Sequence, residues 1–230
     1  MTTVVTLTSG GMDSATAAAW AEKELNPDRH VCLFVDYGQR NAPHERRAAE
    51  AVADELGAEF KVVGVYWPRL LFPYNPLFSG GLPREEGTEE LSANWLPARN
   101  WNLIGVAAAL CDDMFLKGED DDFHIVWGIN AEEAERFPDN TREFAEAVAE
   151  ALKVGTPSKP ELHSPLADLD KPGIVKLADR LNAPLHLTVS CYNPEWEDDV
   201  PVHCGRCEAC FHRKRAFQEA GIEDPTRYRE

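Results

Sequence analysis

The sequence predicts an α/β fold in which helices cover both faces of a doubly wound, mostly parallel sheet. Short apolar runs of strand length alternate along the chain with longer segments of helical composition, and this alternation is typical of parallel sheets. Several of the apolar runs end in glycine-containing or polar loops, as the ligand-binding loops of such sheets do. With 230 residues, the chain is long enough for one substantial domain and too short for two comfortable ones.

The first predicted strand is the apolar run 2–7, and the alanine-rich segment 12–25 after it has the composition of a helix. The second strand, 30–35 (HVCLFV), is a nearly continuous apolar run, as expected of a strand covered on both faces. The next helix, within 43–57, begins at a proline and ends at a glycine, the residues preferred at those two positions. A third strand is expected over 61–66.

Residues 67–94 break the alternation, because prolines, glycines and scattered aromatic residues replace any periodic pattern. A connection of this length is too long for a passive turn, so it is expected to be either a mobile lid or substrate loop, or an insertion packed on the surface. In the second case its apolar side chains would make the contact: Leu70, Leu71, Phe72 and Phe78.

The remaining elements resume the alternation of strands and helices. Asn140 is expected to cap one of the helices, with Glu143 three residues further on completing the capping pattern. The expected helices are 101–115, 141–152 and 174–181, and the expected strands are 123–127 and 162–166.

Charge and composition restrict the class of function. The chain has 23 basic and 40 acidic residues, and its net charge of −17 disfavours non-specific binding to a polyanion such as tRNA or DNA. No apolar stretch approaches the roughly 20 residues needed to cross a bilayer, and the N-terminus lacks the pattern of a signal peptide. A small-molecule substrate, no nucleic-acid or membrane partner and a cytoplasmic location are therefore expected.

The most informative motif is the loop 9–14 (SGGMDS), which connects the first strand to the first helix. Ser9, Gly10, Gly11, Met12, Asp13 and Ser14 place backbone N–H groups, two hydroxyl groups and a helix N-terminus around one small volume, which favours phosphate. Asp13 adds a carboxylate that suits Mg²⁺. The loop lacks the Gly-Lys-Ser/Thr of kinases and GTPases. The alternative is an ordinary glycine turn.

Four of the six cysteines form a second motif near the C-terminus, with the spacing C-x12-C-x2-C-x2-C. Four thiolates complete a closed tetrahedral shell around Zn²⁺, so the site is expected to be structural. An iron–sulfur cluster and a redox pair are the alternatives. Cys32 and Cys111 are expected to be buried apolar residues. The four expected ligands are Cys191, Cys204, Cys207 and Cys210.

The phosphate loop and the cysteines, together with further motifs, resemble the 7-cyano-7-deazaguanine synthase family of N-type ATP pyrophosphatases nearly end to end. The motifs are 9–14 (SGGMDS), 35–41 (VDYGQRN), 98–100 (ARN), Gly128, Pro138-Asp139 with 142–144 (REF), 164–166 (SPL) with Asp170-Lys171, 190–193 (SCYN) and 204–210 (CGRCEAC).

The resemblance implies a Rossmann-like fold of the adenine nucleotide alpha hydrolase type, with a nucleotide-binding domain over 1–187 and a zinc-binding element over 188–230. It implies a C–N ligase that adenylates 7-carboxy-7-deazaguanine with ATP and Mg²⁺ and converts it with ammonia to the nitrile, releasing AMP and pyrophosphate. It also implies a homodimer and a place in queuosine and archaeosine biosynthesis.

Roles for individual residues follow from the same resemblance. The catalytic residues are expected to be Asp13, Ser14, Arg99 and Lys171. ATP is expected to contact the loop residues 9–14 together with Asp36, Gln39, Arg40, Arg99 and Gly128. The substrate is expected to contact Tyr37, Asn100, Asp139, Asn140 and Arg142. For each basic residue, a surface salt bridge is the alternative.

Other functions stay open because the substrate side departs from the family pattern. Where the family carries Tyr-Pro-Asp-Cys-Arg, this chain has 137–142 (FPDNTR), and its segment 128–135 (GINAEEAE) also differs. A paralogue that stops at the amide or uses another amine would fit this pattern. A tRNA-modifying enzyme is disfavoured by charge, since the short run 213–215 (RKR) is expected to cap the final helix. A non-catalytic nucleotide-binding module is the third alternative.

Overall fold

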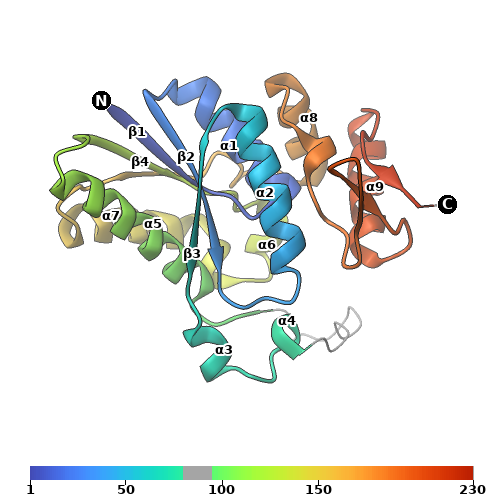
Figure 1. The fold of residues 1–230 in the computed structure, drawn as a ribbon, viewed down its shortest axis with the longest axis horizontal. Coiled ribbons are helices and arrows are strands. Elements are labelled where there is room, and N and C mark those ends of the chain that lie inside the picture. Colours follow the sequence, from blue (N-terminus) through green and yellow to red (C-terminus); the bar gives the residue numbers. More distant parts are fainter. Residues whose placement is uncertain (80–94, 230) are drawn as a thin grey trace.

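A computed structural model describes residues 1–79 and 95–229 of the chain, and its centre is a parallel sheet of five strands in the order β3-β2-β1-β4-β5 (Figure 1). The strands run in parallel register, so that Val4 of β1 lies between His30 of β2 and His124 of β4. The strands are β1 (Thr2–Leu7), β2 (Arg29–Asp36), β3 (Glu59–Gly64), β4 (Asp122–Val126) and β5 (Glu161–His163).

Helices cover both faces of this sheet, as the alternating pattern predicts (Figure 1). On one face lie α1 (Met12–Trp20), α2 (Ala42–Leu56) and α8 (Lys171–Leu181); on the other lie α5 (Arg99–Leu116) and α7 (Arg142–Gly155). Neighbouring residues of β1 enter opposite cores, because Val4 packs with α1 and α8 whereas Val5 packs with α5. The doubly wound, mostly parallel fold is confirmed.

The boundaries of several elements differ from the sequence prediction. The helix expected over 12–25 ends at Trp20, and a π-helical turn, Ala21–Leu25, follows it. The cap of α7 is Thr141, whose Oγ1 accepts the Phe144 N–H at 3.1 Å, so the prediction of an Asn140 cap was wrong. Asn140 is instead buried, and its amide donates to Asp139 Oδ1 at 3.4 Å.

Two short helices begin the long connection after β3: α3 (Trp67–Leu71) and α4 (Pro76–Ser79). Leu70 and Leu71 are 79% and 65% exposed, so they do not pack the connection onto the surface as one expectation required. The rest of the predicted lid or insertion, 80–94, lies outside the described residues. A further short helix, α6 (Ala131–Ala134), follows β4.

The C-terminal part forms a second, smaller sheet that the sequence did not reveal: β6 (Glu195–Glu197), β7 (Val200–His203) and β8 (Arg227–Tyr228). Helix α9 (Glu208–Ala220) lies beside α8, so this part packs on the helical face of the parallel sheet (Figure 1). The predicted division between 1–187 and 188–230 stays a prediction. Cys32 and Cys111 are fully buried, and burial raises the pKa of the Cys32 thiol to about 11. Within 1–79 and 95–229, no helix is long and apolar enough to cross a membrane.

Candidate functional site

The loop between β1 and α1 turns sharply at Gly10, whose φ of +78° lies in the left-handed region. A Cβ atom at this residue would lie 2.4 Å from the carbonyl oxygen of Glu45 and 2.9 Å from the Cβ of Ala48, both in α2. Glycine is therefore required by the backbone angle and by the contact with α2. This close packing sets the loop at the carboxyl edge of the parallel sheet.

Two hydroxyl groups hold the shape of the loop. Ser14 Oγ accepts the Ser9 N–H at 3.1 Å and donates to the Gly11 carbonyl at 3.1 Å, while Ser9 Oγ lies 3.1 Å from Ser14 Oγ. Gly11 is the N-cap of α1 and provides no side-chain acceptor, so the first N–H groups of the helix, from Met12 onward, have no intrahelical partner. A helix that begins in this way is suited to bind an anion.

Asp13, in the first turn of α1, is the centre of a polar group built from three separate elements. Its Oδ2 accepts from Lys171 Nζ at 2.5 Å and from Asn130 Nδ2 at 2.9 Å. Lys171 opens α8 and also lies 3.6 Å from Glu133 Oε1, while Asn130 caps α6. Burial alone would lower the pKa of Lys171, but Asp13 and Glu133 raise it, so the ammonium group stays charged.

Gly128, which follows β4, leaves the space in which the polar side chains around Asp13 come together. A Cβ atom at Gly128 would lie 3.1 Å from the carbonyl carbon and oxygen of Asp13 and 3.2 Å from the Ser14 nitrogen. The loop after β4 therefore touches the start of α1, as expected where the strand order reverses between β1 and β4. Sequence reasoning missed Asn130 and Glu133 as site residues, although Asn130 lies three residues after the end of the predicted strand 123–127.

Arg99, the first residue of α5, lies half-buried on the other side of the carboxyl edge. Burial opposes its charge, but the electrostatic influence of Tyr37, Glu133 and Asp139 is larger and raises the pKa of Arg99. Its Nε donates to Asn100 Oδ1 at 3.4 Å. Arg99 therefore connects the loop after β2, the residues after β4 and the start of α5.

Three of the predicted substrate residues come together beside Arg99. Asn100 donates from its backbone N–H to Asp139 Oδ2 at 3.2 Å and from its amide to the Asp139 carbonyl at 2.8 Å. Asn140 donates to the other oxygen of Asp139, and all three residues are buried. Arg142, in contrast, is exposed and forms an ion pair with Asp168. The structure thus groups the first three and places Arg142 with a different partner.

The loop after β2 carries the remaining predicted ATP residues. Asp36 accepts the Gly38 N–H at 2.8 Å, and buried Gln39 accepts the Tyr37 N–H at 3.0 Å and donates to Glu45 at 3.0 Å. These bonds hold the loop against α2, where burial raises the pKa of Glu45. Arg40 is exposed, and its backbone N–H donates to Leu77, so its assignment to phosphate charge stays a prediction.

The four cysteines of the C-terminal motif lie together, with their sulfur atoms within 4.8 Å of one another. Cys207 Sγ is 3.4 Å from Cys210 Sγ and 4.0 Å from Cys191 Sγ, and Cys204 Sγ is 4.0 Å from Cys210 Sγ. Four sulfurs around a tetrahedral zinc, each at about 2.3 Å, would be about 3.8 Å apart, so the cluster fits one ion. A four-iron cluster places each thiolate on a different iron and needs wider spacing.

Backbone N–H groups favour the ionised form of these thiols. The N–H groups of Cys204 and Asn193 point at Cys191 Sγ, at 3.2 and 3.3 Å. Burial opposes ionisation of Cys204, but the N–H groups of Arg206 and Cys207, together with the thiols of Cys191 and Cys207, lower the pKa of Cys204 to about 6. Burial raises the pKa of Cys191 and of Cys210. Hydrogen bonds of this kind orient and support thiolate ligands.

The cysteine element is joined to the phosphate loop by the segment before Cys191. Val189 donates its N–H to the Gly10 carbonyl at 2.8 Å, and buried Arg213 of α9 holds the flanking residues, with bonds to Thr188 Oγ1 at 2.8 Å and Ser190 Oγ at 3.1 Å. The prediction that 213–215 caps the final helix was wrong, because α9 continues to Ala220. Arg213 is instead a buried residue whose hydrogen bonds to Thr188 and Ser190 join α9 to the segment before Cys191.

Comparison with known proteins identifies the family. The sequence profile of one family, described as queuosine biosynthesis protein QueC, matches residues 3–221. A relative from Methanopyrus kandleri, named 7-cyano-7-deazaguanine synthase, is 72% identical over 230 residues, which is 100% of both chains. Relatives of the same name from Pyrococcus furiosus and Pyrococcus abyssi are 40% and 38% identical over 97% and 99% of this chain and 95% and 98% of theirs. The chain belongs to the queuosine biosynthesis protein QueC family.

Proposed function

We propose that this chain is an ATP-dependent ligase that converts 7-carboxy-7-deazaguanine and ammonia to 7-cyano-7-deazaguanine. The observation that carries the proposal is the 72% identity, over the whole length of both chains, to a relative of that name. The site geometry supports it, because an anion-binding helix N-terminus, a lysine and a buried arginine meet at the carboxyl edge of the sheet.

The proposed reaction has two adenylation steps. In the first, a carboxylate oxygen of the substrate attacks the α-phosphorus of ATP and expels pyrophosphate; ammonia then displaces AMP and leaves the amide. In the second, the amide oxygen attacks the α-phosphorus of a second ATP and expels a second pyrophosphate; the adenylated amide then loses its nitrogen-bound proton and AMP, which takes the amide oxygen with it, and the nitrile remains. AMP leaves readily where a bare oxygen would not, which is why two ATP molecules are used.

Residues of the phosphate loop bind and orient the leaving pyrophosphate in this scheme. The N–H groups of the first turn of α1, from Met12 onward, would donate to the anion, and the Ser9 and Ser14 hydroxyls lie within the same turn. Lys171 and Arg99 balance the charge that develops as the bond to the α-phosphorus breaks. The Asp13 carboxylate provides an oxygen of the kind Mg²⁺ prefers, and Mg²⁺ would supply further neutralisation of the phosphates.

A small pocket lies beside Arg99, with room for about one water molecule, so a heterocyclic substrate would have to widen it. Its walls come from β2, the residues after β2 and β3, and the start of α5, and they are apolar or aromatic apart from Arg99 and Asn102. Buried Asp139 offers a carboxylate, which is the acceptor that a guanine-like N–H and amino edge requires. Lining residues include Val35, Tyr37, Val65, Trp67, Leu96 and Arg99.

Product analysis tests this function. The protein is incubated with ATP, Mg²⁺, ammonium and 7-carboxy-7-deazaguanine, and mass spectrometry and nucleotide chromatography follow the products. We expect the nitrile, AMP and pyrophosphate, with two AMP formed per nitrile. An amide with one AMP selects the paralogue, turnover that requires RNA selects the tRNA-modifying enzyme, and ADP with orthophosphate, or no turnover, rejects the proposal.

The four cysteines are proposed to hold structural Zn²⁺, since four thiolates leave no open position for a reacting group. The link from Val189 to Gly10 ties this element to the phosphate loop. Chelation is therefore expected to melt the C-terminal element and to weaken ATP binding, measured by metal analysis, circular dichroism and calorimetry. An iron–sulfur cluster would show visible absorption, and unchanged ATP affinity in the metal-free protein would reject the link.

Cytoplasmic localisation stays a prediction from the sequence pattern, and a homodimer stays a prediction from the family resemblance. Light scattering coupled to size-exclusion chromatography measures the oligomeric state directly: twice the mass of one chain supports the dimer, and a single chain mass rejects it.

A further inference from the structure

Two histidines and a glutamate form a second cluster of metal-binding side chains, outside the site described above. His124 comes from the middle of β4, and Glu161 and His163 come from β5, the edge strand next to it. The register pairs His124 with Glu161 and Val126 with His163. His124 and Val126 share a parity along β4, so both face the side of the sheet on which α1 packs.

The distances within the cluster fit one small ion. His124 Nδ1 lies 2.9 Å from His163 Nε2. The two carboxylate oxygens of Glu161 lie 3.9 Å from His124 Nδ1 and 3.8 Å from His163 Nε2. Donor atoms about 2.05 Å from a tetrahedral ion are about 3.3 Å apart, and the measured distances lie on both sides of this value.

Neighbouring residues orient the two imidazole rings. Asp122, two residues before His124 on the same face of β4, has its Oδ1 atom 3.5 Å from His124 Nε2. A carboxylate at the outer nitrogen of a histidine favours a proton there, which leaves a lone pair on Nδ1; this atom now shares a hydrogen bond with His163 Nε2, which a bound ion would replace. The ring of Trp20, at the end of α1, lies 5.7 Å from that of His163.

The two histidines of the cluster are mostly buried, but the cluster is open to solvent on the side of Glu161. The side chains of His124 and His163 are only 15% and 17% exposed, whereas that of Glu161 is 69% exposed, so an ion would enter from the carboxylate side.

We propose that His124, Glu161 and His163 bind a divalent transition-metal ion that joins β5 to β4. Two imidazoles and one carboxylate suit Zn²⁺, Co²⁺ or Ni²⁺, whereas Mg²⁺ and Ca²⁺ prefer oxygen ligands alone. β5 has three residues and pairs only with β4 in the described sheet, so a shared ion would stabilise this edge. The chain continues from β5 towards Lys171, which connects the edge strand to the site at the carboxyl edge.

Cobalt binding tests the proposal, and it distinguishes this site from the cysteine cluster. Co²⁺ is titrated into protein that carries its native metal at the four cysteines, and the visible spectrum and calorimetric heat are recorded. We expect one equivalent to bind with cobalt ligand-field bands and without a sulfur-to-cobalt charge-transfer band. Binding that always brings the charge-transfer band, or none at all, rejects the site.

Variants assign the binding to these residues. His124→Gln and His163→Gln are expected to abolish cobalt binding, and Glu161→Gln to weaken it at least about tenfold. Cobalt is also expected to raise the melting temperature of the wild type but not of these variants. The matched control is His186→Gln, an exposed histidine elsewhere, which should bind as the wild type does.

Glu161 is exposed, so Glu161→Gln should fold even if a histidine variant does not. Weaker cobalt binding in this variant is then not caused by misfolding. Melting temperatures and circular dichroism without metal verify this. Equal cobalt affinity in wild type and folded Glu161→Gln, or a loss of affinity in His186→Gln, would overturn the proposal. Neither result bears on the proposed synthase reaction, which is measured separately by product analysis.

Discussion

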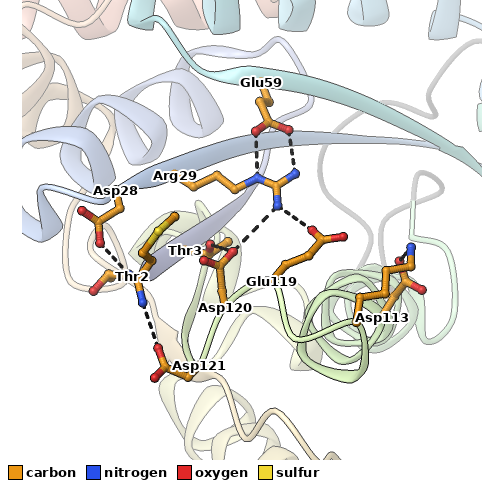
Figure 2. Close-up of polar contacts among 11 residues, drawn as sticks. Thr2, Thr3, Asp28, Arg29, Glu59, Asp113, Glu119, Asp120 and Asp121 are labelled. Atoms are coloured by element: carbon orange, nitrogen blue, oxygen red, sulfur yellow. Dashed lines mark hydrogen bonds and ion pairs between the residues drawn. The ribbon is translucent and has the colours of Figure 1, made fainter.

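The two edges of the parallel sheet both gather charged residues, but they use them differently. At the amino edge, Arg29 of β2 donates to both oxygens of Glu59 in β3, at 2.7 and 3.0 Å, and to Glu119 at 2.9 Å, with Asp120 at 3.7 Å (Figure 2). The guanidinium group is thus surrounded by carboxylates from β3 and the segment before β4, and Figure 2 shows them converging on it.

At the carboxyl edge, the charged groups lie next to backbone N–H groups. Asp13 and Lys171 pair beside the N-terminus of α1, where the first helical N–H groups have no intrahelical partner. Strand direction explains the difference, since every helix that follows a parallel strand begins at the carboxyl edge and directs its positive end there. We therefore predict that the amino edge contributes stability and that the carboxyl edge binds ATP and carries the reaction.

The largest expected effect at the carboxyl edge comes from Gly10→Ala. The added methyl group would overlap the Glu45 carbonyl and strain a left-handed residue, so the phosphate loop must move. A displacement of this kind costs about 100-fold in turnover, and we expect at least this loss in kcat/KM for ATP. Steady-state kinetics and thermal melting measure the two consequences.

Gly57→Ala is the matched control, because Gly57 also has a positive φ, of +68°, but nothing lies within 4 Å of its added Cβ. It should lose only about 1 kcal/mol of stability and keep its activity. Equal losses of kcat/KM in the two variants would show that the contact of Gly10 with α2 does not determine ATP turnover.

The next effect is expected for Lys171→Gln, which removes a positive charge beside Asp13. We expect kcat to fall about 100- to 1,000-fold, as for other groups that stabilise developing charge. The control is Lys153→Gln, since Lys153 pairs with Glu150 on an exposed face of α7. If Lys171→Gln kept the kcat of the wild type, the charge of Lys171 would have no catalytic role.

At the amino edge, Arg29→Met should reduce stability without changing the KM for ATP. The side chain of Asp120 is 1% exposed, and losing Arg29 leaves it with a hydrogen bond from Thr3 at 2.6 Å. We expect a loss of about 2–3 kcal/mol in urea unfolding. The added change Asp120→Asn should restore part of this stability. A raised KM for ATP in Arg29→Met would show that the amino edge also affects ATP binding, contrary to the proposed difference between the two edges.

The smallest effect is a pH dependence at the same edge. The hydrogen bond from Arg29 lowers the pKa of Glu59, so the folded state favours the ionised carboxylate. This stabilisation is present above the unfolded pKa of about 4.3 and is lost as pH falls through the lower folded value. Near neutral pH, the free energy of unfolding of the wild type should exceed that of Glu59→Gln by no more than about 1 kcal/mol. This difference in unfolding free energy should disappear at acid pH. A difference that grew at acid pH would show that the pKa of Glu59 is raised, not lowered, by folding.

Much of the fold was predictable from local patterns, because apolar runs and turn residues report directly on strands and loops. Gly10 illustrates this, since the motif 9–14 (SGGMDS) between a predicted strand and a predicted helix already indicated a phosphate loop. The C-terminal strands were missed because each has four residues or fewer, too short for a periodic pattern. The cap of α7 was predicted one residue too early, at Asn140, because which side chain accepts the Phe144 N–H depends on the direction of the Thr141 side chain in the folded chain.

The sequence by itself determined where the strands, the phosphate loop and the four cysteines lie along the chain, because each depends on neighbours in sequence. Only the tertiary structure decided which distant residues meet: Asn130 with Asp13, Arg213 with the segment before Cys191, and His124 with His163. The physical reason is that these contacts depend on strand order and helix packing, which are properties of the whole core and leave no trace in a local pattern.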